Sequence, residues 1–201
     1  MDTKERILQA ALELYNKEGI NTITSRHVAA KLDMSPGNLH YHFKHTEDII
    51  RALYDRLVLG FDEIMQGIAH TRVVALDSIR TFVEQSFALT YKYRFIFLHF
   101  VEIGLRIPAI RASYYAITQR REKEFLSFFE QFGLLRDDIP ERVLQSLVTQ
   151  IFIVADFWLS NNELTLRLKG ARALKHYEEV FFHMFYPYLT EEGRKRMACR
   201  L

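Results

Sequence analysis

The amino-acid sequence predicts an all-α protein in which a small N-terminal helix-turn-helix unit precedes a larger helical body. Three observations favour this class. Only 8 Gly and 4 Pro occur in 201 residues, which favours long helices over a strand-and-turn architecture. Apolar residues recur three and four positions apart, and strand-like alternation never lasts more than a few residues. The hydrophobic fraction of 49% and charged fraction of 26% are those of an ordinary globular protein.

The first two helices have clear ends. Residues 3–18 carry apolar side chains on one face and are followed by Gly19, a residue preferred just after a helix C-terminus. Thr24 or Ser25 is a suitable N-cap for the second helix, whose apolar side chains include Val28. The pattern therefore predicts two short amphipathic helices.

The third and fourth helices begin with equally specific signals. Asp33 and Met34 form a turn, and Ser35 is an N-cap with Pro36 at the first helical position, where its missing N–H is tolerated. Thr46 is expected to cap a fourth helix that runs from residue 47 to about residue 65.

The rest of the chain is expected to form long, apolar-rich helices whose ends are set by prolines. Their expected ranges are 74–91, 93–105, 108–132, 141–161 and 167–186, with a short tail helix from Thr190. Pro108, Pro140 and Pro187 fall at the boundaries.

The third helix has the character of a helix that enters a DNA major groove. It is short and turns inward only Leu39 and Phe43. Its free face offers Pro36 and Tyr41 for apolar contact with a thymine methyl group, and Asn38 for hydrogen bonds to base edges. The neighbouring histidines and lysine can donate to phosphates. The candidate DNA-binding residues are Thr24, Ser25, Arg26, Ser35, Pro36, Gly37, Asn38, His40, Tyr41, His42, Lys44 and Thr46.

Residues 4–50 resemble the DNA-binding domain of the tetracycline-repressor (TetR) family of bacterial regulators. The matching residues are Arg6-Ile-Leu, Ala10-Ala11, Gly19, Thr24, Val28-Ala29, Ser35-Pro-Gly-Asn-Leu, Tyr41-His-Phe and Glu47. The resemblance implies that eight of the candidates touch DNA, namely Thr24, Ser35, Pro36, Gly37, Asn38, His40, Tyr41 and His42. The chain departs from the family at His40, where a tyrosine is common, and at Thr46, where a lysine often contacts phosphate. Lys44 or His45 is expected to supply the missing positive charge.

Other classes of function find little support in the sequence. Residues 1–50 contain six basic and seven acidic side chains, so bulk charge does not indicate a nucleic-acid partner. His42 and His45 are three apart, but no carboxylate or cysteine completes a metal-binding set. We find no nucleophile–base arrangement, phosphate-cradling glycine loop or paired catalytic carboxylates. The sequence therefore predicts neither an enzyme, nor a metal site, nor a cofactor.

The helical body is expected to enclose an effector pocket. Residues 93–106 form an aromatic-rich run whose polar interruptions, His99 and Glu102, lie on one face of a helix. These two residues, like Asp156, could line the pocket, face solvent or lie at an interface. The candidate pocket residues are Phe87, Tyr91, Phe97, His99, Phe100, Glu102, Tyr114, Phe128 and Trp158. Residue by residue, a plain core role is the alternative. If a ligand binds, we expect it to be apolar or aromatic.

The last two long helices are apolar on more than one side, which predicts a second helical partner. We expect them to pair with their copies in a twofold four-helix interface, which is also where the family resemblance places the dimer. The candidate interface residues are Phe152, Ala155, Leu159, Tyr177, Val180, Phe181 and Met184.

Together these patterns predict a ligand-responsive, homodimeric repressor that binds a palindromic operator in double-stranded DNA and is released by a small effector. The expected division is a DNA-binding domain at 1–46 and an effector-binding and dimerisation domain at 47–201. The single cysteine, Cys199, fits the reducing cytoplasm, and the apolar stretch 147–159 looks too short and polar to span a membrane. The alternative is a helical small-molecule-binding or protein-docking module without sequence-specific DNA binding.

Overall fold

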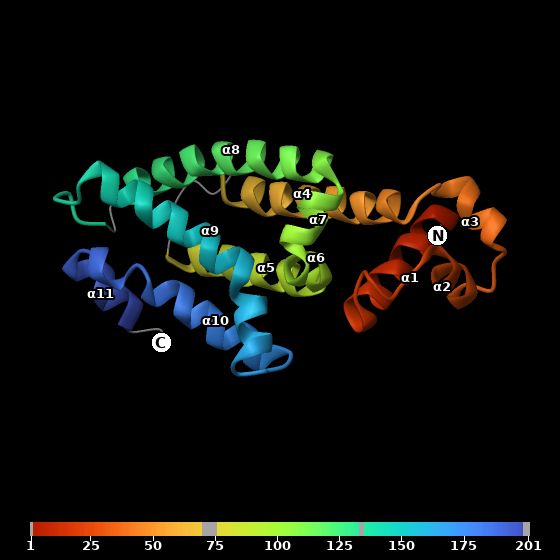
Figure 1. Ribbon diagram of the computed structural model, residues 1–201. Helices are drawn as coiled ribbons and strands as arrows, with labels where there is room; N and C mark the ends of the chain where they lie inside the picture. Colours follow the sequence, from red (N-terminus) through yellow and green to blue (C-terminus); the bar gives the residue numbers. More distant parts are fainter. Residues whose placement is uncertain (1, 70–75, 133–134, 199–201) are drawn as a thin grey trace.

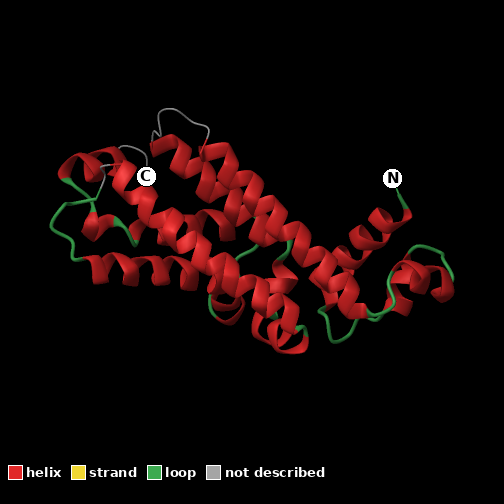
Figure 2. Ribbon diagram, turned by 90° about the horizontal axis from the view of Figure 1, so that it is seen from above, coloured by secondary structure: helices red, strands yellow, loops and turns green. Residues whose placement is uncertain are grey.

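The computed structural model describes residues 2–69, 76–132 and 135–198, so Cys199 lies outside the described residues. Within the described ranges the chain is built of helices and loops (Figure 2). One isolated bridge joins Leu135 and Leu189 in these ranges. The helices are α1 (Thr3–Glu18), α2 (Ser25–Lys31), α3 (Pro36–His42), α4 (Thr46–Ala69), α5 (Leu76–Lys92), α6 (Arg94–Leu98), α7 (Phe100–Arg106), α8 (Pro108–Phe132), α9 (Glu141–Leu164), α10 (Ala171–His183), the 3₁₀ turn η1 (Tyr186–Tyr188) and α11 (Glu191–Ala198). The all-α prediction is confirmed.

Two units share α4 (Figure 1). The first half of this helix buries Ile49, Ile50 and Leu53, which join the core of α1–α3. The second half lies in the elongated body beside α5 and α8. The predicted domain boundary, between residues 46 and 47, therefore falls at the start of a helix that contributes to both units. The division into two domains remains a proposal.

Helix ends in the N-terminal unit follow the predicted signals. Gly19 has φ of +80° and its N–H donates to the Tyr15 carbonyl at 2.9 Å. Thr24 is the N-cap of α2, and its N–H donates to Nδ1 of His27 at 3.1 Å. The Ser35 Oγ accepts the Asn38 N–H at 3.2 Å, with Pro36 at the first helical position. Thr46 is the first residue of α4 rather than its cap. The N–H of His45, the residue before the helix, donates to the Asp48 carboxylate at 2.9 Å.

The expected helix at 93–105 is wrong, because the chain breaks at His99 into α6 and α7. His99 has φ of −119° and ψ of 25°, which are not helical values. The two short helices have different partners: α6 packs against α9 and α1, whereas α7 packs against α8. One straight helix could not make both sets of contacts.

The last long helix begins later than expected, at Ala171 instead of residue 167. Arg167 and Gly170 both have positive φ, 52° and 54°, so the chain turns here before it can enter a right-handed helix. The Asn162 side chain holds this turn, because its amide donates to the Leu168 carbonyl and its oxygen accepts the Leu168 N–H, both at 3.0 Å.

Asn16 fastens the N-terminal unit to the body. Its Nδ2 donates to the Lys92 carbonyl at 2.8 Å, and its Oδ1 accepts the Phe95 N–H at 3.1 Å. The rings of Tyr15 and Phe95 pack beside it with centroids 5.1 Å apart. Polar bonds to two backbone groups at the α5–α6 junction therefore fix the end of α1 against the body.

The apolar stretch 147–159 was expected to be too short and polar to span a membrane. It lies within α9, and this helix of 24 residues is long and apolar enough to cross a membrane by length and composition. That finding is weak support for membrane insertion, since core helices of soluble proteins have the same composition. In α9, Leu147, Val148 and Ile151 are buried against other helices, and Asp156 lies in the middle of the apolar run.

Candidate nucleic-acid interface and ligand cavity

The candidate nucleic-acid interface is the outer face of α3, at the end of the molecule farthest from α11 (Figure 1). Leu39 is 1% exposed and anchors the inner face. Tyr41, two residues later, is 84% exposed, and its only described ring contact is the edge of His42 at 5.3 Å. An exposed aromatic side chain of this kind adds little to folding and is available to a partner.

The other predicted DNA-binding residues lie around Tyr41 in sequence, at the start of α2, along α3 and at the start of α4. The exposed ones are Thr24, Arg26, Ser35, Pro36, Gly37, Asn38, His40 and Lys44. Ser25, His42 and Thr46 are half-buried. Because α2 and α3 pack against each other, these residues come from one compact helix-turn-helix unit.

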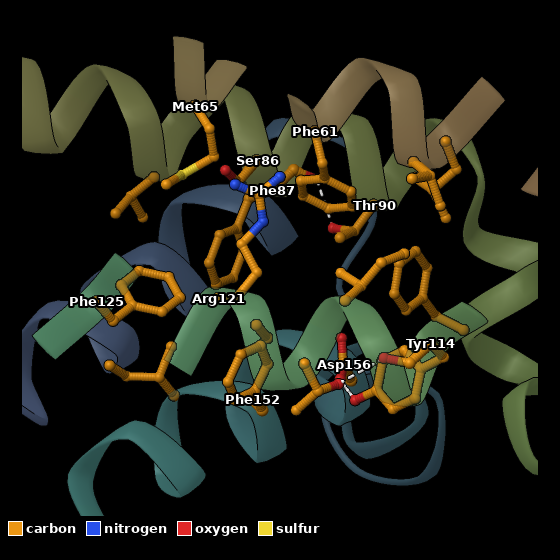
Figure 3. A pocket seen from close by; sticks show the side chains of 18 of the residues that line it. Phe61, Met65, Ser86, Phe87, Thr90, Tyr114, Arg121, Phe125, Phe152 and Asp156 are labelled. Carbon is orange, nitrogen blue, oxygen red and sulfur yellow. Dashed lines mark hydrogen bonds between the residues drawn. The ribbon is translucent and has the colours of Figure 1, made fainter. Parts of the chain in front are cut away.

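An internal cavity of about 130 Å³ lies in the body between α4, α5, α8 and α9 (Figure 3). Its walls are largely aromatic. Four predicted pocket residues line it: Phe87, Phe97, Phe100 and Tyr114. Further lining residues include Phe61, Met65, Ser86, Thr90, Arg121, Phe125 and Asp156. The break at His99 places Phe97 and Phe100 on the same cavity, because it ends one helix and redirects the next.

Four other predicted pocket residues do not line this cavity. Tyr91 and Trp158 form a layer behind it, with rings stacked at 6.4 Å, and the Trp158 Nε1 donates to Thr90 at 3.3 Å. The His99 Nδ1 lies 3.4 Å from the Glu102 carboxylate at the junction with the N-terminal unit, where Glu102 also accepts a hydrogen bond from Asn21. The side chain of Phe128 lies outside the described residues.

Asp156 is the polar residue that sequence reasoning left open, and it faces the cavity. Its carboxylate accepts a hydrogen bond from the Tyr114 hydroxyl, and burial raises the pKa of Asp156 from 3.8 to about 6. Burial, with the nearby Asp156 carboxylate, also raises the pKa of Tyr114 far above its usual range. The hydroxyl is therefore the donor and the carboxylate the acceptor at neutral pH.

Arg121 is a second charged residue in the cavity wall, and it is paired. Its two terminal nitrogens lie 2.6 Å from Asp62 and 2.7 Å from Glu124. Arg120 also binds Asp62, at 2.7 Å. In the described part of the chain, no group of three or more His, Cys, Asp or Glu residues is placed to hold a metal ion.

Comparison with known proteins agrees with this arrangement of a helix-turn-helix unit and a helical body. The family model "Bacterial regulatory proteins, tetR family" matches residues 7–53. The model "Bacterial transcriptional repressor" matches residues 61–197, which is more than half of the chain. The chain belongs to the TetR family. This family consists of bacterial transcriptional regulators and is not a class of enzymes.

Individual relatives have low sequence identity to this chain. The HTH-type transcriptional regulator UidR of Escherichia coli K12 is 27% identical over 114 residues, which span 55% of this chain and 56% of UidR. A TetR-family regulator from Marinobacter aquaeolei VT8 has the same fold with a TM-score of 0.88 at 27% identity, over 99% of this chain and 97% of that one. A Saccharomonospora viridis protein in complex with choline has a TM-score of 0.73 at 22% identity, over 94% and 97%.

The seven predicted dimer residues do not share one surface of this TetR-family chain. Phe152, Ala155 and Phe181 line the cavity. Leu159 and Tyr177 are buried in the chain's own core, Met184 is half-buried and Val180 is exposed. Side chains that their own chain covers are not available to a second copy. Exposed apolar side chains on α9 and α10 are instead Ile153, Phe157, Leu164 and Val180.

Proposed function

We propose that the protein is a cytoplasmic homodimeric repressor that binds a palindromic operator through α3 and is released when a small effector enters the cavity. The observation that carries the proposal is the 84% exposure of Tyr41 on a two-turn helix whose opposite side is anchored by Leu39. Such a helix presents groups to a partner instead of adding to the core.

The DNA-reading face combines the kinds of group that a major groove requires. Asn38 is proposed to bind base edges, Tyr41 and Pro36 to contact a thymine methyl group, and His40 and Lys44 to bind phosphates. Ser25, Arg26 and Thr24 at the start of α2 are proposed to contact the backbone on the other side of the groove. In a twofold dimer, two such faces read half-sites roughly 34–36 Å apart.

Two copies are proposed to meet through α9 and α10, with the apolar side chains that the monomer leaves exposed. Ile153, Phe157 and Leu164 recur along one face of α9, and Val180 lies on α10. A twofold axis through this face would pair each helix with its copy in a four-helix arrangement.

Ile153→Glu is expected to weaken dimerisation by on the order of 100-fold, because each dimer would then bury two unpaired carboxylates. Ile153 is 55% exposed in one chain, so its replacement leaves monomer folding almost unchanged. Sedimentation velocity across a concentration series measures the change. Leu59→Glu is the control, since Leu59 is exposed on α4, away from this face. Unchanged dimerisation of Ile153→Glu would contradict the proposed interface.

Effector release is proposed on the basis of the cavity. Its aromatic lining fits a small apolar or aromatic compound. Two proteins of similar fold have been solved as complexes with small molecules, SmeT with triclosan and a Saccharomonospora viridis regulator with choline. A ligand releases DNA only if it binds the DNA-free arrangement more tightly than the DNA-bound one. The alternative function is a helical small-molecule-binding or protein-docking module, and salt dependence separates the two.

The test is binding of the purified full chain to the DNA just upstream of its own gene, against a scrambled fragment, across a salt series. We expect selective binding of two chains, or a multiple of two, per site. Affinity should fall on the order of 10²–10³-fold between 50 and 200 mM salt, because phosphate neutralisation releases counterions. Equal binding to both fragments at every salt concentration would contradict operator recognition at this locus and favour the docking module.

A further inference from the structure

The cavity contains a carboxylate that the protein leaves short of partners. Asp156 accepts one described hydrogen bond, from Tyr114, whereas a carboxylate can accept about four. Within the described residues, no Lys, Arg or His side chain forms an ion pair with Asp156. Asp156 is half-buried, and a carboxylate that is partly withdrawn from water is costly unless something else supplies a positive charge.

The cation in the described cavity wall does not supply that charge. Arg121 already holds Asp62 and Glu124, each within 2.7 Å. Arg121 is thus neutralised by partners of its own, and Asp156 is the charged group of the described lining that has no ion-pair partner. An anionic ligand would be repelled by this carboxylate, and a neutral apolar ligand would leave it unpaired.

The remaining walls are suited to a cation that carries an apolar body. The rings of Phe100 and Tyr114 meet edge to face at 4.7 Å beside Asp156, and Phe152 lies on the same side of the cavity (Figure 3). The faces of aromatic rings attract ammonium groups. Across the cavity lies Ser86 (Figure 3), whose buried hydroxyl has no hydrogen-bond partner in the described part of the chain.

Asp156 can also be approached from outside. A groove of about 240 Å³ runs between α8 and α9, and Asp156, Tyr114 and Phe152 line both this groove and the inner cavity. Glu122 lies on the groove as well. The Tyr114–Asp156 pair thus stands in the wall between the groove and the cavity. Ile153 and Phe157 also line the groove, so this approach is open in a single chain, and the proposed dimer covers part of it.

We propose that the effector is a small organic cation, an amine or quaternary ammonium with an aromatic or branched apolar body, whose charged group binds Asp156 in place of the Tyr114 hydroxyl. This inference rests on the proposed effector role of the cavity. The volume of about 130 Å³ is close to that of a buried cavity of roughly 150 Å³ that accepts benzene. The apolar body is therefore about one aromatic ring in size.

Isothermal titration of the full chain, without DNA, tests the proposal with three probes of matched size. They are phenethylamine, 2-phenylethanol and phenylacetate at pH 7.5. We expect the amine to bind at least tenfold more tightly than the alcohol and the carboxylate to bind most weakly. Equal binding of amine and alcohol, or no binding of the amine at millimolar concentration, would overturn the proposal.

Variants then assign the effect to the carboxylate. Asp156→Asn is expected to lose the preference for the amine while binding the alcohol unchanged. Asp55→Asn, which removes the same charge from the exposed face of α4, should behave like the wild type. Tyr114→Phe keeps the carboxylate and should keep amine binding. Loss of amine binding in this variant would make Tyr114 the recognition group and contradict the proposal, whatever the result for Asp156→Asn.

The outcome is independent of operator recognition, because these titrations contain no DNA. Amine binding that leaves operator affinity unchanged would support the cation site and contradict its effector role. Operator binding without amine binding would contradict the cation site alone.

Discussion

Tyr41→Ala is expected to lower operator affinity by on the order of 10²–10³-fold per dimer while the melting temperature stays within about 1 °C. Aromatic anchors at recognition surfaces commonly contribute about 2 kcal/mol each, and a dimer loses two of them. Folding is spared because the side chain is 84% exposed. Electrophoretic mobility shift or fluorescence anisotropy gives the affinity, and thermal unfolding gives the stability.

The matched control is Tyr115→Ala, which removes a tyrosine that is 68% exposed on α8. It should bind operator as the wild type does. If Tyr41→Ala lowered DNA affinity, dimerisation and melting temperature together, Tyr41 would be a structural residue, and the proposed DNA-reading face would be wrong at its centre.

Asp156→Asn is expected to raise the free energy of unfolding by on the order of 2 kcal/mol per chain at pH 8. The folded-state pKa of about 6, against 3.8 for an ordinary aspartate, corresponds to about 3 kcal/mol of destabilisation once the carboxyl is ionised. Asparagine has nearly the same shape, carries no charge and still accepts from Tyr114. Part of the gain is lost because that hydrogen bond becomes neutral.

The sign of the pH dependence follows from the raised pKa. Between about pH 4 and pH 6 the folded chain holds the Asp156 proton and the unfolded chain releases it, so this residue's contribution to stability falls as pH rises through that window. The gain from Asp156→Asn should therefore be small at pH 4 and reach its full size above pH 7. Urea unfolding at both pH values measures it, with Asp55→Asn as the surface control. A gain that is equal at both pH values, or a loss at pH 8, would contradict the assignment.

Much of the N-terminal unit was predictable because its signals are local. Ser35 with Pro36, and Gly19 after an apolar face, act within one turn of the chain, and the structure places each helix end beside them. The break at His99 was not predictable in this way. Residues 93–106 are apolar on both sides of that position, and the break depends on the different helices against which α6 and α7 pack.

In the helical body, the hydrophobic pattern of the sequence did not predict which residues line the cavity. Phe152, Ala155 and Phe181 belong to helices that are apolar around most of their circumference, so the sequence does not show which side meets a partner, a cavity or the core. Their places in the cavity wall come from the packing of α9 and α10 against α5 and each other. Asp156 was visible as a polar interruption, but its depth, and with it the raised pKa, is a tertiary property.

Helix α4 has a mechanical consequence. It is one unbroken rod of 24 residues, about 36 Å long at the usual rise, with Ile50 at one end in the DNA-binding unit and Phe61 and Met65 in the cavity wall. A tilt of about 5° around the cavity end would carry the other end through about 3 Å over that length. A small change in the packing around the cavity would thus be enlarged along α4 into a larger displacement of the DNA-binding unit. In the proposed dimer, equal displacements in the two copies would change the distance between the two recognition helices.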